Sequence, residues 1–397
     1  MAAASATPIP PVASPLAATA GSLAAPGRDT ALDVWRGFAL VTIFVNHVSG
    51  NVLEQFTHKN FGFSDAADLF VFFAGYAAAS AYFGKYLAQE KLSTSCKVLS
   101  RSVKLYTTHL ALVVLGGAVF ATMAISKGDL GLFSVMALEP LMLDPAGALV
   151  DAVTLRYQPG FLNILPLYCV LIGTLPLLMA LAARSMGAAI AVSAALWLAA
   201  GLTGTNFHTY PIPGGWFFNP LAWQFLFVLG FAMGARRNRL GAATTYHRLW
   251  WWAALAYLLL GLLVARGTGL PAPGWLAPLP DFLTVPEKQF LSAPRLLHVL
   301  ALCYVVVHSP LQAWARALPR LHPLAMMGRH SLPVFCTGLV VSITGVAFKQ
   351  TGFDGALFDI AYVTAGVGTQ VLVAAMLCVT EKRRGSKPPA APLPAAV

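Results

Sequence analysis

The chain has 397 residues, of which 57% are hydrophobic and only 10% are charged, and its mean hydropathy is +0.69. Soluble chains carry roughly 25% charged residues, and a single hydrophobic core stops growing at about 250–300 residues. An ordinary soluble protein is therefore excluded. The formal net charge is +11, but nucleic-acid binding would require Lys and Arg to cluster on an otherwise polar face, so we predict a membrane protein with no nucleic-acid partner.

The two ends of the chain differ from the rest. Residues 1–27 are mostly Ala, Pro, Ser and Thr and include no charged side chain. Such a segment cannot bury enough apolar surface to become ordered, so we expect a disordered cytoplasmic tail there, and another at 385–397. Between them, residues 28–384 are expected to form one membrane domain.

Apolar runs of membrane-spanning length recur through this domain. A bilayer core of about 30 Å needs about 20 such residues for each helix. We therefore predict an all-α, polytopic helical bundle of about ten spans. The spans are expected at roughly 34–53, 66–86, 99–124, 161–183, 187–204, 219–235, 247–266, 294–315, 330–348 and 358–380.

Basic residues favour one side of the predicted membrane. With the N-terminus in the cytoplasm, 18 of the 26 Lys and Arg residues fall on the inner side and seven on the outer side, and Arg36 lies at a membrane edge. Because cytoplasmic loops carry an excess of Lys and Arg, this distribution favours an N-in, C-in topology. The long outer loops at about 125–160 and 267–293 contain six of the fifteen Asp and Glu residues, so we look for a polar substrate on that side.

The first span contains four polar residues that helical geometry brings to one stripe: Asp33, Arg36, His47 and Asn51. At about 100° per residue, the eleven steps from Arg36 to His47 return to within roughly 20° of the start. Ionisable groups inside a span normally face a cavity or the bundle interior. We interpret His47 as a general base, since its ordinary pKa lies near neutrality; the alternative is a histidine that hydrogen-bonds a neighbouring helix.

Two acids lie at the start of the second span, Asp65 and Asp68. One interpretation is that they cap the helix and occupy its first turn. The other is that one of them orients His47, as a carboxylate orients a catalytic imidazole.

Further candidates lie near the ends of other spans. Arg295 and His298 share one face at the outer start of the eighth span, where they either bind an anion or anchor the helix at the interface. Trp216 lies near the outer interface and belongs either to an aromatic belt or to a sugar-stacking surface. On the inner side, the basic residues Arg101, Lys104 and Arg329 either anchor the topology or bind a phosphorylated cofactor.

Several kinds of chemistry have no sequence support. The chain has no GxxxxGK[ST], HExxH or GxSxG motif. Its five cysteines, Cys96, Cys169, Cys303, Cys336 and Cys378, show no metal-binding spacing. We therefore expect no bound metal and no disulfide framework.

Eight sequence blocks together resemble the OpgC family of membrane succinyltransferases for osmoregulated periplasmic glucans, related to the wider acyltransferase-3 group. They are Leu32-Asp-Val-Trp-Arg-Gly-Phe-Ala-Leu40 with Phe44-Val-Asn-His-Val-Ser-Gly-Asn51, Asn60-Phe-Gly-Phe-Ser-Asp-Ala-Ala67 with Phe70-Val-Phe-Phe-Ala-Gly-Tyr76, Leu162-Asn-Ile-Leu-Pro-Leu-Tyr168, Asn219-Pro-Leu-Ala-Trp-Gln-Phe225, Pro294-Arg-Leu-Leu-His298 and Gly328-Arg-His-Ser-Leu-Pro-Val-Phe335. The likeness covers about residues 28–384.

The resemblance implies about ten spans in a bacterial inner membrane, a coenzyme A thioester donor on the cytoplasmic side and an acceptor hydroxyl on a periplasmic glucan. The acyltransferase-3 pattern of a basic residue, ten intervening residues and a histidine matches Arg36 and His47. One departure is Asn46, where the pattern often has Asp before the histidine.

The resulting hypothesis has succinyl-CoA bound with its nucleotide near Arg101, Lys104 and Arg329 and its arm passing Arg36. His47, assisted by Asp65 or Asp68, would activate the glucan hydroxyl. Arg295 would bind the succinyl carboxylate, and His298, Asn51 and Trp216 would contact the substrate. Two alternatives remain: transfer of an acetyl or other acyl group to another envelope polysaccharide, and a transporter of an anionic metabolite or glycan.

Overall fold

The computed structural model describes residues 29–210, 214–241, 244–267, 274 and 278–385. Over these ranges the chain is helical, with no strand. The tails expected at 1–27 and 385–397 lie outside the described residues, apart from Gly385, which still belongs to the last helix.

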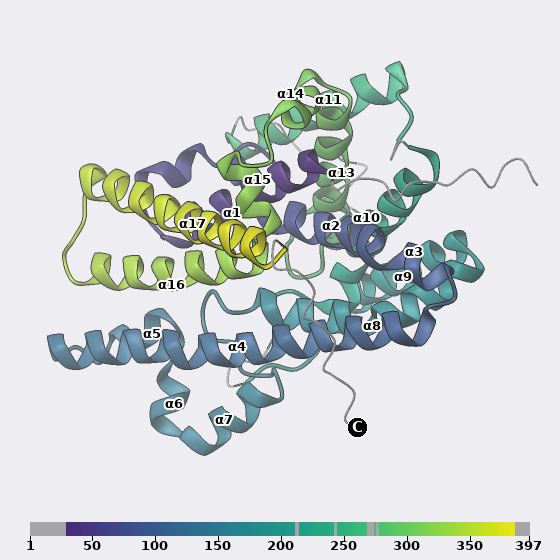
Figure 1. The fold of residues 1–397 in the computed structure, drawn as a ribbon. Coiled ribbons are helices and arrows are strands. Elements are labelled where there is room, and N and C mark those ends of the chain that lie inside the picture. The colour runs from purple at the N-terminus through teal and green to yellow at the C-terminus, as the bar shows by residue number, and fades with distance from the viewer. Residues whose placement is uncertain (1–28, 211–213, 242–243, 268–273, 275–277, 386–397) are drawn as a thin grey trace, which may run out of the picture.

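The helices follow one another along the chain (Figure 1). They are α1 (Thr30–His47), η1 (Val52–Phe56), η2 (His58–Asn60), α2 (Ala66–Ala78), the π-helical turn η3 (Ala79–Phe83), α3 (Gly84–Leu87), α4 (Lys91–Lys127), α5 (Leu132–Val135), α6 (Glu139–Leu143), α7 (Pro145–Val153), α8 (Ile164–Arg184), α9 (Met186–Thr203), α10 (Pro220–Leu240), α11 (Arg248–Ala265), α12 (Asp281–Thr284), α13 (Ala293–Val307), α14 (Pro310–Ala317), α15 (Pro323–Arg329), α16 (Ser331–Gln350) and α17 (Ala356–Gly385).

The predicted spans coincide with long helices. Within the described chain, seven segments are long and apolar enough to cross a membrane, or eight if the bent pair α13 and α14 forms one span. The two other helices at predicted spans, α1 and α10, carry charged residues such as Arg36 and Arg237. An all-helical protein with several apolar spans is thus confirmed, whereas the number ten and the topology stay predictions.

The eighth predicted span is not one straight helix. α13 and α14 meet at an angle of 68°. The break falls at Ser309 and Pro310, where Ser309 caps the N-terminus of α14. Proline has no N–H for an intrahelical hydrogen bond and its ring clashes with the preceding turn, which explains why α13 cannot continue.

The first predicted span also ends earlier than expected. α1 stops at His47 instead of residue 53, and Gly50 follows with a φ of +77°, which favours glycine. The Asn51 carboxamide accepts from the backbone N–H groups of Leu53 and Glu54 and so caps η1. Asn51 is therefore not on the α1 stripe, and this expectation was wrong.

Glycines hold α1 and α2 close to their partner helices. Gly37 of α1 faces the carbonyl of Leu324 in α15, and an added Cβ would lie 2.0 Å from that oxygen. Gly230 of α10 faces the carbonyl of Phe72 in α2, where the corresponding distance is 2.1 Å. Backbone approach this close fixes the position of α1, which carries Arg36 and His47.

The remaining long helices lie around α1, α2 and α10. α4 and α8 run side by side along one edge in Figure 1, and α16 lies between α4 and α17. α11 is peripheral: Gly261 is its one buried residue, while Trp250 is 66% exposed. Large apolar side chains exposed over a whole helix indicate contact with lipid.

Candidate active site

His47 lies at the last position of α1, and its ring orientation is fixed by its own helix. Its Nδ1 lies 2.6 Å from the carbonyl oxygen of Ile43. Because a carbonyl only accepts hydrogen bonds, Nδ1 must carry the proton, and the lone pair of a neutral imidazole is then on Nε2. A general base needs an unprotonated nitrogen, and this tautomer provides one at Nε2.

His47 borders a cavity of about 350 Å³, here called the His47 cavity. It lies between the end of α1, the start of α2, the start of α8 and α16. Its lining includes Ile43, Asn46, His47, Lys59, Asp65, Phe161, Asn163, Phe217, Phe218, Lys288 and Phe335. The cavity combines amides, two ammonium groups and aromatic rings around the histidine, a lining suited to a polar ligand that also offers apolar faces.

Arg36 borders a second cavity of about 260 Å³, here called the Arg36 cavity. Its lining includes Arg36, Phe70, Ala74, Tyr82, Arg101, Leu105, Leu165, Tyr168, Ser331 and Phe335. A guanidinium N–H of Arg36 donates to the hydroxyl of Ser331 at 2.5 Å. The Tyr168 hydroxyl is buried and has no hydrogen-bond partner among the described residues, which leaves a donor and acceptor for a ligand in this cavity.

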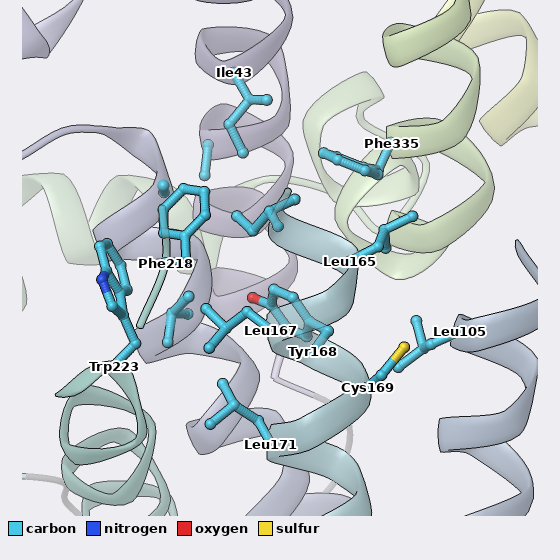
Figure 2. Packing of buried hydrophobic residues seen from close by; sticks show 14 of the residues in the cluster. Ile43, Leu105, Leu165, Leu167, Tyr168, Cys169, Leu171, Phe218, Trp223 and Phe335 are labelled. Carbon is cyan, nitrogen blue, oxygen red and sulfur yellow. The ribbon is translucent and has the colours of Figure 1, made fainter. Parts of the chain in front are cut away.

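Phe335 of α16 is part of the wall of both cavities. Figure 2 shows its ring pointing from α16 toward α8 and α1, between Leu165 and Ile43. Leu165 lines the Arg36 cavity, and Ile43 lines the His47 cavity. Arg36 and His47 lie eleven residues apart, or about 16 Å along the axis of α1. One stripe of α1 therefore contributes to two cavities that meet at one aromatic side chain.

Asp65 and Asp68 serve the helix and an ion-pair cluster. Asp65 accepts from the N–H of Ala67, and Asp68 accepts from the N–H of Asp65, which completes a capping box at the start of α2. Asp68 is fully buried and receives two hydrogen bonds from Arg295, at 3.0 and 2.6 Å. Asp65 pairs with Lys288 at 2.6 Å and with Arg295 at 2.7 Å. The hydrogen bond that orients His47 is donated by its Nδ1–H to the Ile43 carbonyl and involves neither acid, so the expectation of an orienting carboxylate is corrected.

The electrostatic setting of Asp65 follows from these contacts. Burial alone would raise the pKa of a carboxyl group. The neighbouring Lys288 ammonium and Arg295 guanidinium outweigh burial and hold the pKa of Asp65 well below its usual range. Asp65 is therefore ionised at neutral pH and keeps Lys288 at the edge of the His47 cavity.

Arg295 is not placed to receive a substrate carboxylate. It is 7% exposed, and its donors are used by Asp68, by Asp65 and by the carbonyl of Phe63. The cations that line the His47 cavity are Lys288 and Lys59 instead. The Lys288 ammonium also lies 5.4 and 5.3 Å from the ring centres of Phe217 and Phe218.

His298 is a buried packing residue beside this cluster. Its Nδ1 hydrogen-bonds the Ser64 hydroxyl at 2.8 Å, and an added Cβ on Gly62 would lie 2.0 Å from its Nε2. Trp216 is 5% exposed and lies outside the His47 cavity, while its neighbour Phe217 is 45% exposed and lines it. The expected substrate contacts of His298, Trp216 and Asn51 are therefore corrected.

The three basic residues expected on the cytoplasmic side separate in space. Arg101 lines the Arg36 cavity. Lys104 is exposed and absent from that lining. Arg329 donates to Glu381 of α17 and lies outside the same cavity, although Ser331 and Leu332 line it.

Sequence reasoning missed Lys288, Lys59, Asn163 and Phe335 as cavity residues. Lys288 and Lys59 were visible only as scattered charges in outer loops, and Asn163 and Phe335 only as parts of family-like blocks.

Asn46 is also explained: its side-chain oxygen accepts from the Thr57 hydroxyl at 2.7 Å, so it anchors the loop that carries Lys59. Among the described residues, no group of three His, Cys, Asp or Glu side chains could hold a metal ion.

The family model described as OpgC protein matches residues 28–382. That match spans nearly all of the described chain, including both cavities. The chain belongs to the OpgC family. No curated protein and no solved structure matches it. Membership of the OpgC family makes the chain a membrane transferase of the acyltransferase type.

Proposed function

We propose that this OpgC-family protein is an O-succinyltransferase of the bacterial inner membrane that transfers succinyl groups from succinyl-CoA to hydroxyls of a periplasmic glucan. The observation that carries the proposal is the pair of cavities along one stripe of α1, with Arg36 in one, His47 in the other and Phe335 between them. A transferase that takes its donor from one side of a membrane and its acceptor from the other needs two such compartments.

The donor enters through the Arg36 cavity. Arg36 and Arg101 supply the positive charge that phosphates require, and the buried hydroxyl of Tyr168 offers a hydrogen bond to an amide of the pantetheine arm. The thioester then lies beyond Phe335, next to His47. The excess of basic residues on the predicted cytoplasmic side supports entry from that side.

The acceptor hydroxyl arrives in the His47 cavity from the periplasm. Nε2 of His47 takes its proton while the hydroxyl oxygen attacks the thioester carbonyl carbon. The new C–O ester bond forms, the C–S bond breaks, and the proton passes from Nε2 to the departing thiolate of coenzyme A. No covalent enzyme intermediate is required, and histidine is restored at the end.

Two features of the His47 cavity fit these substrates. Lys288 and Lys59, which pair with Asp65 and Glu54, line the cavity and provide cations for the free carboxylate of a succinyl group. Arg295 does not line it. Phe217, which is 45% exposed, offers an apolar face for a sugar ring, and Asn46 and Asn163 offer amides for its hydroxyls.

The test uses the purified full-length protein in lipid nanodiscs with succinyl-CoA radiolabelled in the succinyl group and a neutral glucan. We expect label on the glucan in an alkali-labile ester, and none when His47→Ala replaces the native protein. A tenfold preference for acetyl-CoA would favour the acetyltransferase alternative. Counterflow of label across proteoliposomes without labelled glucan would favour transport, and either result would overturn the proposal.

A further inference from the structure

A third cavity lies on the other side of α1 and α2, and it shares no lining residue with the Arg36 or His47 cavity. Its volume is about 520 Å³, and it lies between α1, α2, α10, α13 and α14; we call it the side cavity. We propose that the side cavity binds an anionic phospholipid of the surrounding membrane, with an acyl chain inside and the phosphate at its basic end.

The wall of the side cavity is suited to a hydrocarbon chain. Its lining includes Leu32, Trp35, Phe38, Leu69, Phe72, Phe73, Met233, Leu302, Val306, Val307 and Leu311. Along α2 the lining runs from Leu69 to Tyr76, about 10 Å of helix. Sites of about 300–1,000 Å³ with mainly apolar walls are typical of small-ligand pockets.

The side cavity reaches the lipid-facing surface. Phe38 and Leu311 line it and are 42% and 51% exposed. Leu311 belongs to α14, which begins at the sharp bend after α13, and Phe38 belongs to α1, which packs against α14. A chain can therefore enter sideways from the bilayer.

One end of the side cavity is basic. Arg237, Arg316 and His308 border it, together with a single acid, Asp29. Arg237 pairs with Asp29 at 2.8 Å, whereas Arg316 makes no ion pair within the described residues. Basic pockets between membrane helices on the cytoplasmic side are suited to anionic headgroups, and the charge distribution of the sequence assigns this end to that side.

The basic end and the apolar wall together distinguish a phospholipid from other ligands. His58, which lines the cavity and lies near His298 at the start of α13, marks the far end, so the charges are concentrated at the end formed by α14 and the end of α10. A nucleotide has no hydrocarbon chain to fill the long apolar wall. A neutral lipid has no anionic group to pair with Arg316.

The first experiment measures lipid retention by the delipidated full-length protein. The protein is exchanged into mixed micelles that contain equal amounts of phosphatidylglycerol and phosphatidylcholine, and bound lipid is counted by native mass spectrometry. We expect preferential retention of phosphatidylglycerol. In Arg316→Gln this preference should fall about fivefold, since one basic residue near a headgroup contributes about 1 kcal/mol. Arg248→Gln, an exposed basic residue at the start of α11, should keep it.

The second experiment blocks the acyl-chain volume. Val306→Trp fills the cavity, and Leu297→Trp places the same ring on an exposed position of α13 outside the lining. Lipid retention should fall in the first variant and stay unchanged in the second. Four results would each overturn the proposal. They are equal retention of both lipids by the native protein, an equal loss of preference in Arg248→Gln, full lipid retention in Val306→Trp, and displacement of the lipid by coenzyme A. Because no step uses His47, these outcomes are independent of the transferase assay.

Discussion

At the scale of single residues, the proposed function depends on one imidazole nitrogen. The Ile43 carbonyl fixes the tautomer of His47 and leaves the lone pair on Nε2, the proposed base. We expect His47→Ala to lower the rate of succinyl transfer by about 10²–10⁴-fold, the usual contribution of general base catalysis. His208→Ala, at an exposed histidine of an outer loop, is the control, and the measurement is the initial rate at equal protein abundance in nanodiscs. Retention of the native rate by His47→Ala would contradict the proposed base.

A second residue-scale prediction separates Arg295 from Lys288. Arg295→Ala leaves the fully buried Asp68 without its cation, and breaking a buried pair in this way costs about 3–5 kcal/mol. A lower melting temperature and loss of folded protein are therefore expected, with the two donors affected alike.

Lys288→Ala should instead act on donor choice. Its side chain is 28% exposed and faces the His47 cavity. We expect the KM for succinyl-CoA to rise at least about tenfold, since a charge-assisted hydrogen bond contributes about 1.5–3 kcal/mol, while the KM for acetyl-CoA stays near its native value. Lys288→Arg should recover much of the difference. An equal rise for both donors would show that Lys288 only holds Asp65.

Sequence predicted Arg36, His47 and Arg101 as cavity residues but misplaced Arg295, Lys104 and Arg329. Arg36 and His47 were supported by helical periodicity and family-like blocks, and Arg101 by its place among the basic residues at the start of the third predicted span. The other predictions failed because the direction of a long basic side chain depends on which acid lies nearest, as Asp68 does for Arg295 and Glu381 for Arg329. Those acids come from other helices, and the sequence contains no local sign of them.

At the scale of elements, close helix packing holds the cavities open. Gly230→Ala would bring a Cβ to 2.1 Å from the carbonyl oxygen of Phe72 and force α2 away from α10. Overpacking of this kind costs about 1–3 kcal/mol, so we expect a lower melting temperature in a thermal-shift measurement of the purified protein. Gly84→Ala is the matched control, because an added Cβ there has nothing within 4 Å. A stable Gly230→Ala variant would show that α2 moves freely.

The ends of elements were harder to predict than their existence. α8, α9 and α11 begin and end within a few residues of the expected limits. α1 was expected to reach residue 53, yet it stops at His47 because the Asn51 side chain caps η1 and Gly50 turns the chain. In the same way, Pro310 divides what its apolar composition suggested was one span. Hydropathy detects apolar runs, and capping groups and prolines decide where they break.

At the scale of the whole molecule, the untested prediction is the topology. α4 is one 37-residue helix with Cys96 near its start and Ser126 near its end, both exposed. At about 1.5 Å per residue these positions are about 45 Å apart. In intact spheroplasts we expect a membrane-impermeant maleimide to label Ser126→Cys in a Cys96→Ser background, and to leave the native Cys96 unlabelled.

Inverted membrane vesicles provide the converse measurement. There Cys96 should be labelled and Ser126→Cys should be protected, because positive-inside orientation places the Lys-rich start of α4 in the cytoplasm. Labelling of Cys96 from the outside would reverse the topology and with it the assignment of the donor to the Arg36 cavity.

The sequence by itself determined the class of the protein. Its low charged fraction and repeated apolar runs require a helical membrane protein, because a chain this apolar cannot be hidden inside a water-soluble core. Periodicity also placed Arg36 and His47 on one stripe, since both lie on the same helix and only 3.6 residues per turn is needed to align them. Tertiary structure decided three features: the meeting of two cavities at Phe335, the pairing of Arg295 with Asp68, and the side cavity at Arg316. These features join residues from helices far apart in the chain, and their contacts depend on how glycine-mediated packing brings those helices together.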